Sequence, residues 1–331
     1  MSVADVVRRA ERKINAFNTK RSLEAGWQPT VVPYIGYGDE TKVRVLARVL
    51  MSNPDREPRT AAVRGFRQFF TIQVGDHQVS VRAGAASVTA TTDRGGYVEV
   101  LLHDHGLEPG WQEVTITAAG AEPAQADVFI MEPGTDFGIV SDIDDTVIVT
   151  MLPRAMIAAY NSWFLRTDKR KAVPGFSEFY AEVQRRHPKA PVFYLSTGAW
   201  NTFGTLRRFL KRNGLPLGPL LLTDWGPTQT GLFRSGQEHK QVQLRNLFID
   251  FPQLRWLLVG DDGQHDPLIY GTAAVEHPDR IAGIAIRNLS PQEHVLSHGT
   301  AGPLDRLELT HVPLIEGADG HRLLEQIDQL D

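Results

Sequence analysis

The second half of the chain alternates short apolar runs with longer helical patterns, and this alternation constrains the fold more than any other feature. Each run is almost continuously apolar, which is typical of strands that are buried on both faces of a parallel sheet. The runs are Phe137–Ser141, Pro191–Leu195, Pro219–Leu222, Arg255–Gly260 and Ile281–Ile286. We therefore predict an α/β domain over residues 134–331, with a parallel sheet and helices on both of its faces.

The stretch from Trp27 to Glu132 has a different pattern, in which short alternating runs are separated by turn residues. This pattern predicts an antiparallel β-sandwich over residues 27–133. The predicted strands are Lys42–Leu50, Gln78–Val81, Ser87–Thr91, Tyr97–Leu102 and Glu113–Thr117, with a more helical stretch at Arg59–Phe70. In its loop His103–His105, adjacent side chains point in diverging directions, so surface residues are favoured over a metal site.

The first 26 residues predict a basic amphipathic helix. Val3, Val7 and Ile14 recur at helical spacing. Six cations surround this apolar stripe between Arg8 and Arg21. Such a helix packs on its own protein or lies at a membrane interface, and the pattern favours the first interpretation while leaving the second open.

Composition excludes several classes of protein. The 331 residues include no cysteine, which rules out disulfides, thiolate metal sites and cysteine nucleophiles. The net charge of -4 gives no overall attraction to nucleic acid or to an anionic membrane. No apolar run reaches the ~18 residues that a membrane-spanning helix needs. We expect a soluble, cytoplasmic protein with no nucleic-acid partner, and contact with a membrane surface remains open.

Polar residues gather where the predicted parallel strands end, which is the edge at which open α/β sheets bind ligands. Asp142–Thr146 reads DxDxT after the first strand, and Ser196, Thr197 and Gly198 follow the second. Lys240 lies in a predicted helix ahead of the fourth strand, and Gly260–Asp266 reads GDxxxxD after it. Four such elements in order predict a site for phosphoryl transfer.

The residue types suit an attack on a phosphate monoester. A carboxylate that attacks an anionic phosphoryl group needs a divalent cation, and Mg²⁺ prefers hard oxygen ligands. We expect Asp142 to be the nucleophile and Asp144 the general acid and base. Ser196 and Lys240 are expected to contact the phosphoryl group, and Lys211 and Arg245 compete with Lys240 for that role. The metal candidates are Asp142, Asp144, Asp261, Asp262 and Asp266.

These motifs resemble those of phosphatases of the haloacid dehalogenase (HAD) superfamily. Within it, the chain is similar to the actin-patch phosphatidate phosphatases of fungi and their bacterial relatives, over about residues 137–290. The motifs that carry the likeness are SDIDDT at 141–146, VPG at 173–175, DWG at 224–226, His239 with Lys240, Phe251 with Pro252 and GDDGQHDPLIY at 260–270. PYIGYG at 33–38 and DRGGY at 93–97 extend it more weakly into the first half.

The resemblance implies a Rossmann-like HAD core, Mg²⁺ as cofactor and the dephosphorylation of phosphatidate to diacylglycerol. It assigns the same roles to Asp142, Asp144, Ser196 and Lys240, and makes Asp261 a metal ligand. The chain departs from the family at Asp262, where a small polar residue is usual. An extra carboxylate there would join the metal shell or change the metal preference.

The gap between Thr146 and the strand before Ser196 leaves room for only a short cap over the site. A short cap leaves the site open, and an open site favours bulky substrates. The segment Met151–Lys171 mixes aromatic side chains with cations such as Arg154, which suits an anionic lipid headgroup, although a helix that packs on the core gives the same pattern. We expect Thr146, Thr197, Gly198 and Arg154 to bind substrate.

Three other functions compete with phosphatidate hydrolysis. One is a soluble phosphomonoesterase that acts on a nucleotide, a sugar phosphate or a phosphoprotein. Another is a binding scaffold without catalysis, which the intact acidic motifs disfavour. The third is dehalogenation, which has no alkoxide to protonate and is therefore disfavoured by a second aspartate at Asp144.

Overall fold

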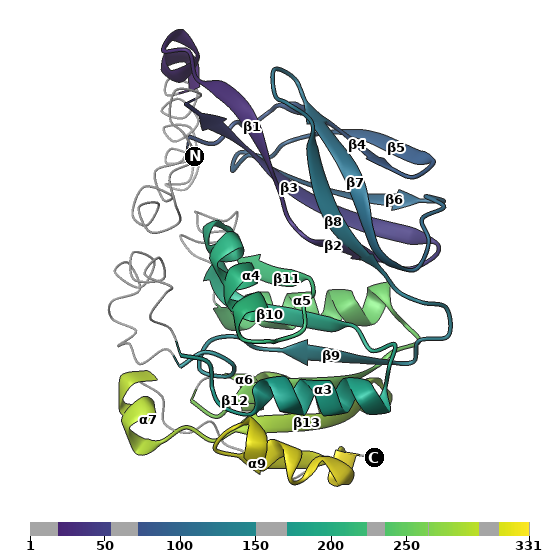
Figure 1. Ribbon diagram of the computed structural model, residues 1–331, viewed down its shortest axis with the longest axis vertical. Coiled ribbons are helices and arrows are strands. Elements are labelled where there is room, and N and C mark those ends of the chain that lie inside the picture. Colours follow the sequence, from purple (N-terminus) through teal and green to yellow (C-terminus); the bar gives the residue numbers. More distant parts are fainter. Residues whose placement is uncertain are drawn as a thin grey trace, which may run out of the picture. The chain divides into compact units, whose positions relative to one another are not determined.

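The computed structural model describes residues 19–53, 72–149, 171–223, 236–263, 265–297 and 311–330. These residues form two compact units, the first ending at Pro133 and the second beginning at Gly134 (Figure 1). Most of the predicted N-terminal helix, the stretch Arg59–Phe70 and the segment around Arg154 lie outside the described residues. Among the residues that are described, no helix is long and apolar enough to cross a bilayer.

Eight strands build the first unit. They are β1 (Gln28–Pro33), β2 (Gly36–Gly38), β3 (Lys42–Ser52), β4 (Gln78–Ala83), β5 (Ala86–Thr91), β6 (Tyr97–His103), β7 (Gly110–Ala118) and β8 (Ala124–Ile130). The order is β1-β3-β2-β8-β7-β4-β5, and β6 pairs with β3. All pairs are antiparallel except β2 with β8.

The predicted antiparallel strands are confirmed, and their hydrogen bonds connect them into one sheet. The 11-residue strand β3 pairs with β6 along one edge and with β1 and β2 along the other. Strand β2 then continues the hydrogen bonding to β8. All eight strands therefore belong to one hydrogen-bonded sheet, because β3 is long enough to serve three partners.

Burial in this unit follows the period of two that a sheet with one covered face requires. Along β6, every second residue is buried, from Val98 through Val100 to Leu102. The buried residues of β3, β4, β7 and β8 join them in one apolar core. The alternation that predicted these strands is thus the alternation of buried and exposed side chains.

His105 is buried, which corrects its interpretation as a surface residue. Its Nδ1 accepts a hydrogen bond from the Leu107 N–H at 2.9 Å, and its Nε2 lies 2.8 Å from the Asp39 carbonyl oxygen. Because both ring nitrogens bind backbone groups, the imidazole holds two loops together. Three consecutive polar letters could not show this pairing, since Asp39 lies far away in the sequence.

The second unit contains a six-stranded, fully parallel sheet of order β11-β10-β9-β12-β13-β14. Its strands are β9 (Phe137–Ser141), β10 (Val192–Ala199), β11 (Leu220–Thr223), β12 (Arg255–Asp261), β13 (Ile281–Arg287) and β14 (Leu314–Gly317). The five predicted runs are confirmed as strands, and β14 was not predicted. Counted within the unit, the order is 3-2-1-4-5-6, which reverses direction at β9.

Helices cover both faces of this sheet, as predicted. They are α3 (Phe176–Arg186), α4 (Phe203–Arg212), α5 (Gly236–Asp250), α6 (Asp266–Glu276), α7 (Pro291–Ser297) and α9 (Gly320–Leu324), with 3-10 turns η5 (Trp200–Thr202), η6 (Pro278–Arg280) and η7 (Ile327–Leu330). Helices α3 and α4 lie in front of the sheet and α5 and α6 behind it (Figure 1). Both layers follow from the right-handed crossovers of parallel strands.

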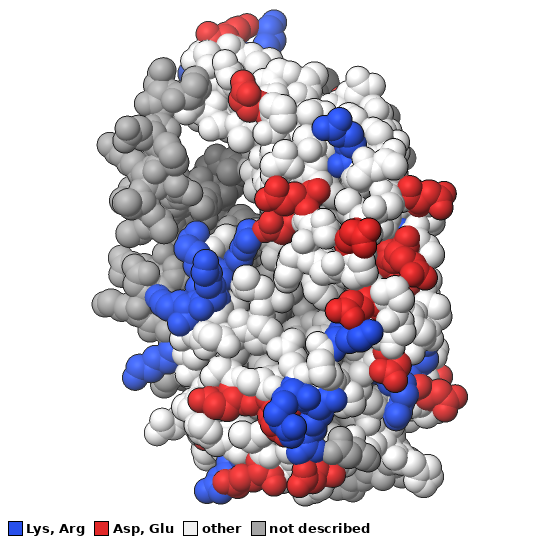
Figure 2. Space-filling view, turned by 45° about the vertical axis from the view of Figure 1, so that its right-hand side comes forward, with Lys and Arg blue, Asp and Glu red and all other residues white. Residues whose placement is uncertain are grey.

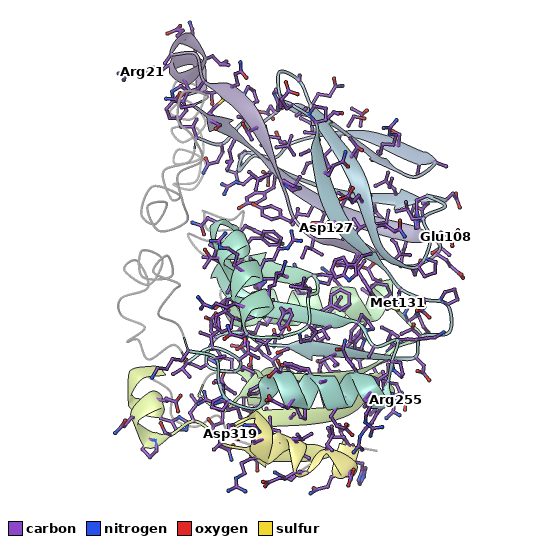
Figure 3. All side chains as sticks on the ribbon, in the orientation of Figure 1. Arg21, Glu108, Asp127, Met131, Arg255 and Asp319 are labelled. Carbon is purple, nitrogen blue, oxygen red and sulfur yellow. The ribbon has the colours of Figure 1, made fainter. Side chains whose placement is uncertain are left out.

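The VPG motif lies where two backbones approach each other closely. Gly175 has a φ of 77° and precedes α3, while Gly320 opens α9. A Cβ on either glycine would collide with the backbone of the other segment, and the Gly320 N–H donates to the Pro174 carbonyl at 2.9 Å. Asp319 caps α9 by accepting from the Arg322 N–H (Figure 3). The motif thus joins the start of α3 to the C-terminal segment.

Candidate active site

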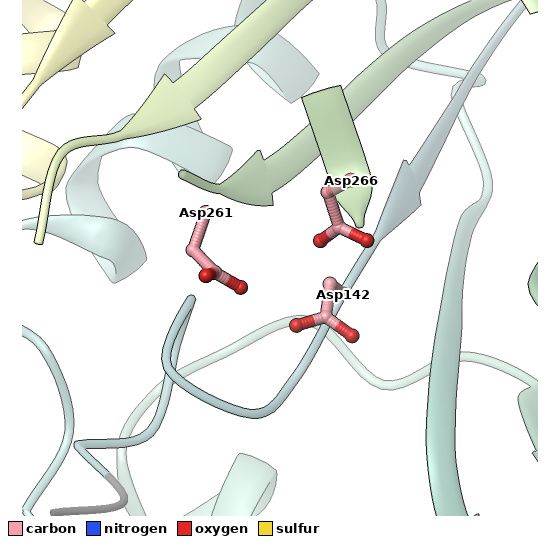
Figure 4. Close-up of side chains that lie close together, drawn as sticks. All are labelled: Asp142, Asp261 and Asp266. Carbon is pink, nitrogen blue, oxygen red and sulfur yellow. The ribbon is translucent and has the colours of Figure 1, made fainter. Parts of the chain in front are cut away.

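Three buried aspartates converge at the carboxyl edge of the parallel sheet. Asp142 follows β9, Asp261 ends β12 and Asp266 opens α6. One carboxylate oxygen from each lies within 4.8 Å of the others, and the three side chains point toward one another (Figure 4). They meet where the strand order reverses, which is where ligands bind in this class of sheet.

The local structure explains why these residues meet. Strands β9 and β12 pair in register up to Ser141 and Val259, and the Asp142 N–H continues the pairing by donating to the Val259 carbonyl at 2.8 Å. A Cβ at Gly260 would lie 2.6 Å from Asp266 Oδ2. The glycine of the GDxxxxD motif therefore makes room for the aspartate at its far end.

Lys240 reaches this cluster from α5. Its Nζ lies 2.7 Å from Asp142 Oδ1 and 2.6 Å from Asp266 Oδ1, and the side chain is buried. The Thr146 hydroxyl donates to the other oxygen of Asp142, Oδ2, at 3.2 Å. Lys211 and Arg245 are exposed and belong to no such contact. Two donors therefore fix the orientation of the Asp142 carboxylate.

Burial dominates the electrostatics of the cluster. It raises the pKa of Asp142 to about 8, although Lys240 lowers it, and the charges of Asp266 and Asp144 add to the rise. Burial also raises the pKa of Asp261 well above its usual value, helped by Asp266 and Asp142. Burial by itself lowers the pKa of Lys240, but the three carboxylates outweigh it and keep the ammonium charged. One ammonium thus faces three carboxylates.

The donor set fits a divalent cation. Asp261 Oδ2 and Asp266 Oδ2 are buried and accept no hydrogen bond, while Asp261 Oδ1 accepts from the Gly263 N–H at 2.8 Å. Buried carboxylate oxygens without a donor are costly unless a cation binds them. Hard oxygen ligands are also those that Mg²⁺ prefers. The cluster contains Asp142, Asp261 and Asp266 of the five predicted metal candidates.

Asp144 stands apart from this cluster and is held by Ser196. The Ser196 hydroxyl donates to Asp144 Oδ2 at 2.9 Å and accepts from the Gly198 N–H at the same distance. Strand β10 extends through Ala199, so Ser196 and Gly198 lie in the strand and not after it. In this structure Ser196 therefore orients Asp144, a contact that the sequence did not predict.

Asp262, another of the predicted metal candidates, lies outside the carboxylate cluster. Its Oδ1 accepts from the Leu289 N–H at 2.8 Å and lies 3.4 Å from His294 Nε2. Successive residues at a strand end point to opposite sides. The extra carboxylate therefore ties the GDD turn to the segment around α7, and the side facing Asp142 is left to Asp261.

Arg287 is a site residue that the sequence analysis missed. It is buried at the end of β13, where its Nη1 donates to the Asp145 carbonyl at 2.5 Å and its Nη2 to Glu293 Oε1 at 2.7 Å. Asp145 has a φ of 61°, so Arg287 stabilises a left-handed turn inside the DxDxT motif. A cation directly after an apolar strand was the signal that could have revealed it.

The remaining substrate-binding candidates lie at the same edge or outside the described residues. Thr197 is half-buried and its carbonyl accepts from the Thr223 hydroxyl at 3.2 Å. Thr146 is fully buried beside Asp142. Val149 N–H donates to the Lys171 carbonyl, so the two ends of the segment that contains Arg154 lie next to each other beside the DxDxT turn.

Comparison with known proteins shows which proteins carry a domain similar to the one that contains this site. Residues 137–288 match the catalytic domain of phosphatidate phosphatase APP1. Phosphatidate phosphatase APP1 of Saccharomyces cerevisiae is 29% identical over 153 residues, which cover 45% of this chain and 25% of that protein. An uncharacterised protein of Schizosaccharomyces pombe is 25% identical over 152 residues, or 46% of this chain and 25% of its own length.

Among solved structures, a phospho-aspartyl intermediate analogue of phosphoserine phosphatase covers 58% of this chain and 98% of that chain. Its identity is 13% and its TM-score is 0.35, which is too low to establish a common fold. The match to the two fungal proteins spans about a quarter of their length. The family match over residues 137–288 includes Asp142, Asp261, Asp266 and Lys240. Residues 137–288 are thus similar to the catalytic domain of the APP1 phosphatidate phosphatases and form a phosphatase domain.

Proposed function

We propose that this protein is a Mg²⁺-dependent phosphomonoester hydrolase of the HAD type that removes phosphate from phosphatidate through an aspartyl-phosphate. The observation that carries the proposal is the buried cluster of Asp142, Asp261 and Asp266, bridged by Lys240 and left with two carboxylate oxygens that accept no hydrogen bond. A binding scaffold would gain nothing from burying this excess of negative charge, which costs stability.

Asp142 is the nucleophile in this mechanism. Lys240 and Thr146 each donate to one of its oxygens, so the carboxylate has one orientation before substrate arrives. Mg²⁺ held by Asp142, Asp261 and Asp266 would screen the charge of the phosphoryl group. The Lys240 ammonium adds a fixed positive charge beside the same atoms. Attack of Asp142 on phosphorus forms the aspartyl-phosphate and releases the alkoxide of the substrate.

Asp144 is the general acid and base in this mechanism. It donates a proton to the leaving alkoxide and then takes one from the water that hydrolyses the aspartyl-phosphate. The hydrogen bond from Ser196 holds Asp144 beside the nucleophile's strand end, and Arg287 holds the turn that follows it. In this proposal Ser196, Thr197 and Gly198 contact the phosphoryl group, and Arg154 is a further substrate-binding residue.

The preference for phosphatidate comes from the family match and from the short cap. We assign residues 134–331 as the HAD-like phosphatase domain, residues 27–133 as a β-sandwich domain and residues 1–26 as an N-terminal amphipathic helix. The enzyme is cytoplasmic and works at a membrane surface, because a two-chain lipid does not leave the bilayer at a useful rate. A soluble phosphomonoester is the alternative substrate.

Phosphate release from the purified full-length chain tests the proposal. The substrates are phosphatidate in mixed vesicles and a panel of soluble phosphate esters, each with Mg²⁺, with Ca²⁺ and with excess chelator. We expect Mg²⁺ to restore activity after chelation and Ca²⁺ to inhibit, since its looser coordination disturbs the in-line geometry. Activity in excess chelator would overturn the mechanism, and a preference for a soluble ester would replace phosphatidate as the substrate.

A further inference from the structure

Asp142 is almost completely buried, so its position depends on protein groups and not on water. Figure 2 shows charged side chains of both signs at the surface of the molecule, where water solvates them. Asp142 is instead 2% exposed. It follows the last residue of β9, so its carbonyl lies beyond the pairing that holds the strand. A buried carbonyl needs another donor, and that donor fixes the backbone from which the carboxylate projects.

Ser141 supplies the donor for the Asp142 carbonyl. The Ser141 hydroxyl donates to that oxygen at 2.7 Å and lies 2.6 Å from the hydroxyl of Tyr180 on α3. A serine hydroxyl has one proton. Because this proton goes to the carbonyl, Tyr180 is the donor in the second hydrogen bond. A chain of two hydrogen bonds therefore runs from α3 through Ser141 to the backbone of the nucleophile.

The N–H of Asp142 is held by a second tyrosine. This N–H donates to the Val259 carbonyl at 2.8 Å, and the Tyr270 hydroxyl donates to the same oxygen at 3.0 Å. Tyr180 comes from α3, in front of the sheet, and Tyr270 from α6, behind it (Figure 1). One buried tyrosine from each helical layer thus supports the peptide groups on either side of Asp142.

The two hydroxyls are specific to this position and not a general feature of the core. A phenylalanine ring would fill the same space without burying a polar group, which is costly unless it is hydrogen-bonded. Burial raises the pKa of Tyr180 and Tyr270 above the usual value of 10, so both keep their protons. Tyr194 is equally buried and pairs in register with Ser141, but its hydroxyl donates to the Pro216 carbonyl at 2.8 Å, in the loop after α4.

We propose that Tyr180 and Ser141 are positioning residues for the reaction. Their hydrogen bonds fix the peptide that follows Asp142, and thereby the direction from which its carboxylate reaches phosphorus and Mg²⁺. Tyr270 fixes the peptide that precedes Asp142 in the same way. This inference rests on the proposed function, because it takes Asp142 as the nucleophile and as a metal ligand.

Hydrolysis of 4-nitrophenyl phosphate by the full-length protein with Mg²⁺ tests the inference. Tyr180→Phe keeps the ring and removes the hydroxyl, so kcat should fall about tenfold while KM stays within about twofold. Tyr194→Phe is the matched control and should keep kcat within about twofold. Both variants lose one buried hydrogen bond, so each should lower the Tm by about 2–4 °C. Equal kcat in the two variants would overturn the inference, because loss of stability would then explain any effect.

A double-variant cycle separates positioning from a general loosening of the core. The hydrogen bonds of Tyr180 reach Asp142 through Ser141, so Tyr180→Phe should change kcat by less than about twofold when Ser141→Ala is already present. Tyr270→Phe acts on the other peptide, and its loss of about tenfold should multiply with that of Tyr180→Phe. Losses that multiply between Tyr180→Phe and Ser141→Ala would contradict the chain of hydrogen bonds.

Mg²⁺ binding is a readout that needs no turnover. Thermal denaturation at increasing Mg²⁺ gives the half-saturating concentration, which should rise about tenfold in Tyr180→Phe and stay within about twofold in Tyr194→Phe. If the wild type hydrolyses no phosphate ester but shows this difference in Mg²⁺ binding, the proposed function fails and the positioning of Asp142 stands. If the wild type is active and Tyr180→Phe matches it in kcat, the inference fails and the proposed function stands. A wild type without turnover whose variants bind Mg²⁺ equally would overturn both.

Discussion

The two units of this protein bury their polar groups in different ways. In the first unit, Arg48 is buried but its Nε donates to the Gly95 carbonyl at 2.8 Å and its guanidinium lies over the Tyr97 ring. His105 likewise uses both ring nitrogens. In the second unit, buried charges gather at one sheet edge and two carboxylate oxygens accept no hydrogen bond. Hydrogen-bonded polar groups stabilise a fold, whereas carboxylate oxygens that are buried without a donor do not, so their burial requires another explanation.

The comparison also extends to the strands themselves. Buried and exposed residues alternate along β6, whereas every residue of β13 is buried. A sheet covered on both faces can place charge only where its strands end, so sequence pattern and ligand site are linked in the second unit. In the first unit the polar residues are spread along the strands. The contrast predicts that substitutions in the two units will separate stability from catalysis.

The largest effect should come from Asp142→Asn. The amide keeps the shape of the side chain but loses the nucleophile, so turnover should fall at least about 100-fold. Stability in chelator should not fall, because the substitution removes one of three buried negative charges. Phosphate release and thermal denaturation measure the two quantities. Asp279→Asn, an exposed aspartate of the same unit, serves as the control and should behave like wild type. Activity above about one per cent of wild type would mean that another residue attacks.

Asp144→Asn should show a loss of turnover that depends on the substrate. An amide cannot protonate the leaving alkoxide, so turnover should fall about 100-fold or more for poor leaving groups and much less for aryl phosphates. A plot of log kcat against leaving-group pKa should be steeper than for wild type. Equal losses across the series would remove Asp144 from the acid role. Ser196→Ala should show the same dependence in weaker form, since Ser196 holds Asp144.

Much of the second unit could be predicted because its signals are local. Five of its six strands and the helix that carries Lys240 follow from apolar periodicity. The missed strand β14 has only four residues, with alternating burial. In the first unit, β1, β2 and β8 were missed, because Gln28–Pro33 contains two prolines and Gly36–Gly38 is too short to show a period. Pairing through β2 depends on contacts distant in sequence, which periodicity does not encode.

The candidate site also has features that local sequence signals predict and features that depend on contacts distant in sequence. Asp142, Asp261 and Lys240 stand at strand ends or helix starts, so topology predicts that they meet. The orientation of Asp262 toward Leu289 depends on side-chain direction after β12, and the role of Arg287 depends on a turn in which Asp145 has a positive φ. Neither is visible in a linear motif. The sequence therefore predicts which segments meet and leaves their hydrogen bonds undetermined.

His105→Ala tests the first unit, where we expect a loss of stability without a loss of catalysis. The substitution leaves the Leu107 N–H and the Asp39 carbonyl without a partner, which should cost about 2–3 kcal/mol of unfolding free energy. His103→Ala, an exposed neighbour, should change stability by less than about 0.5 kcal/mol. Urea denaturation measures both. Turnover of a soluble ester per folded molecule should match wild type, and a drop in turnover with intact stability would instead give His105 a role in the reaction.

The smallest expected effect is a gain of stability in Asp261→Asn when metal is removed. Burial raises the pKa of Asp261 well above its usual value of 3.8 and that of Asp142 to about 8. Between about pH 4 and pH 8 the folded protein then holds protons that the unfolded chain releases, so its stability falls as pH rises. Asp261→Asn removes one of the two aspartates whose raised pKa values cause this decline in stability.

In chelator at about pH 8, we therefore expect the unfolding free energy of Asp261→Asn to exceed that of wild type by about 1–2 kcal/mol. Between about pH 5 and pH 8, the unfolding free energy of the variant should also decline less steeply than that of wild type. Adding Mg²⁺ should reverse the order, because a ligand stabilises only the protein that binds it. Denaturation with and without Mg²⁺ at the two pH values measures this, and Asp279→Asn should follow wild type throughout. A variant that is less stable than wild type in chelator would show that Asp261 supports the metal-free fold. The cluster would then resemble the paired polar groups of the first unit, and burial of its charge could no longer be attributed to a bound cation.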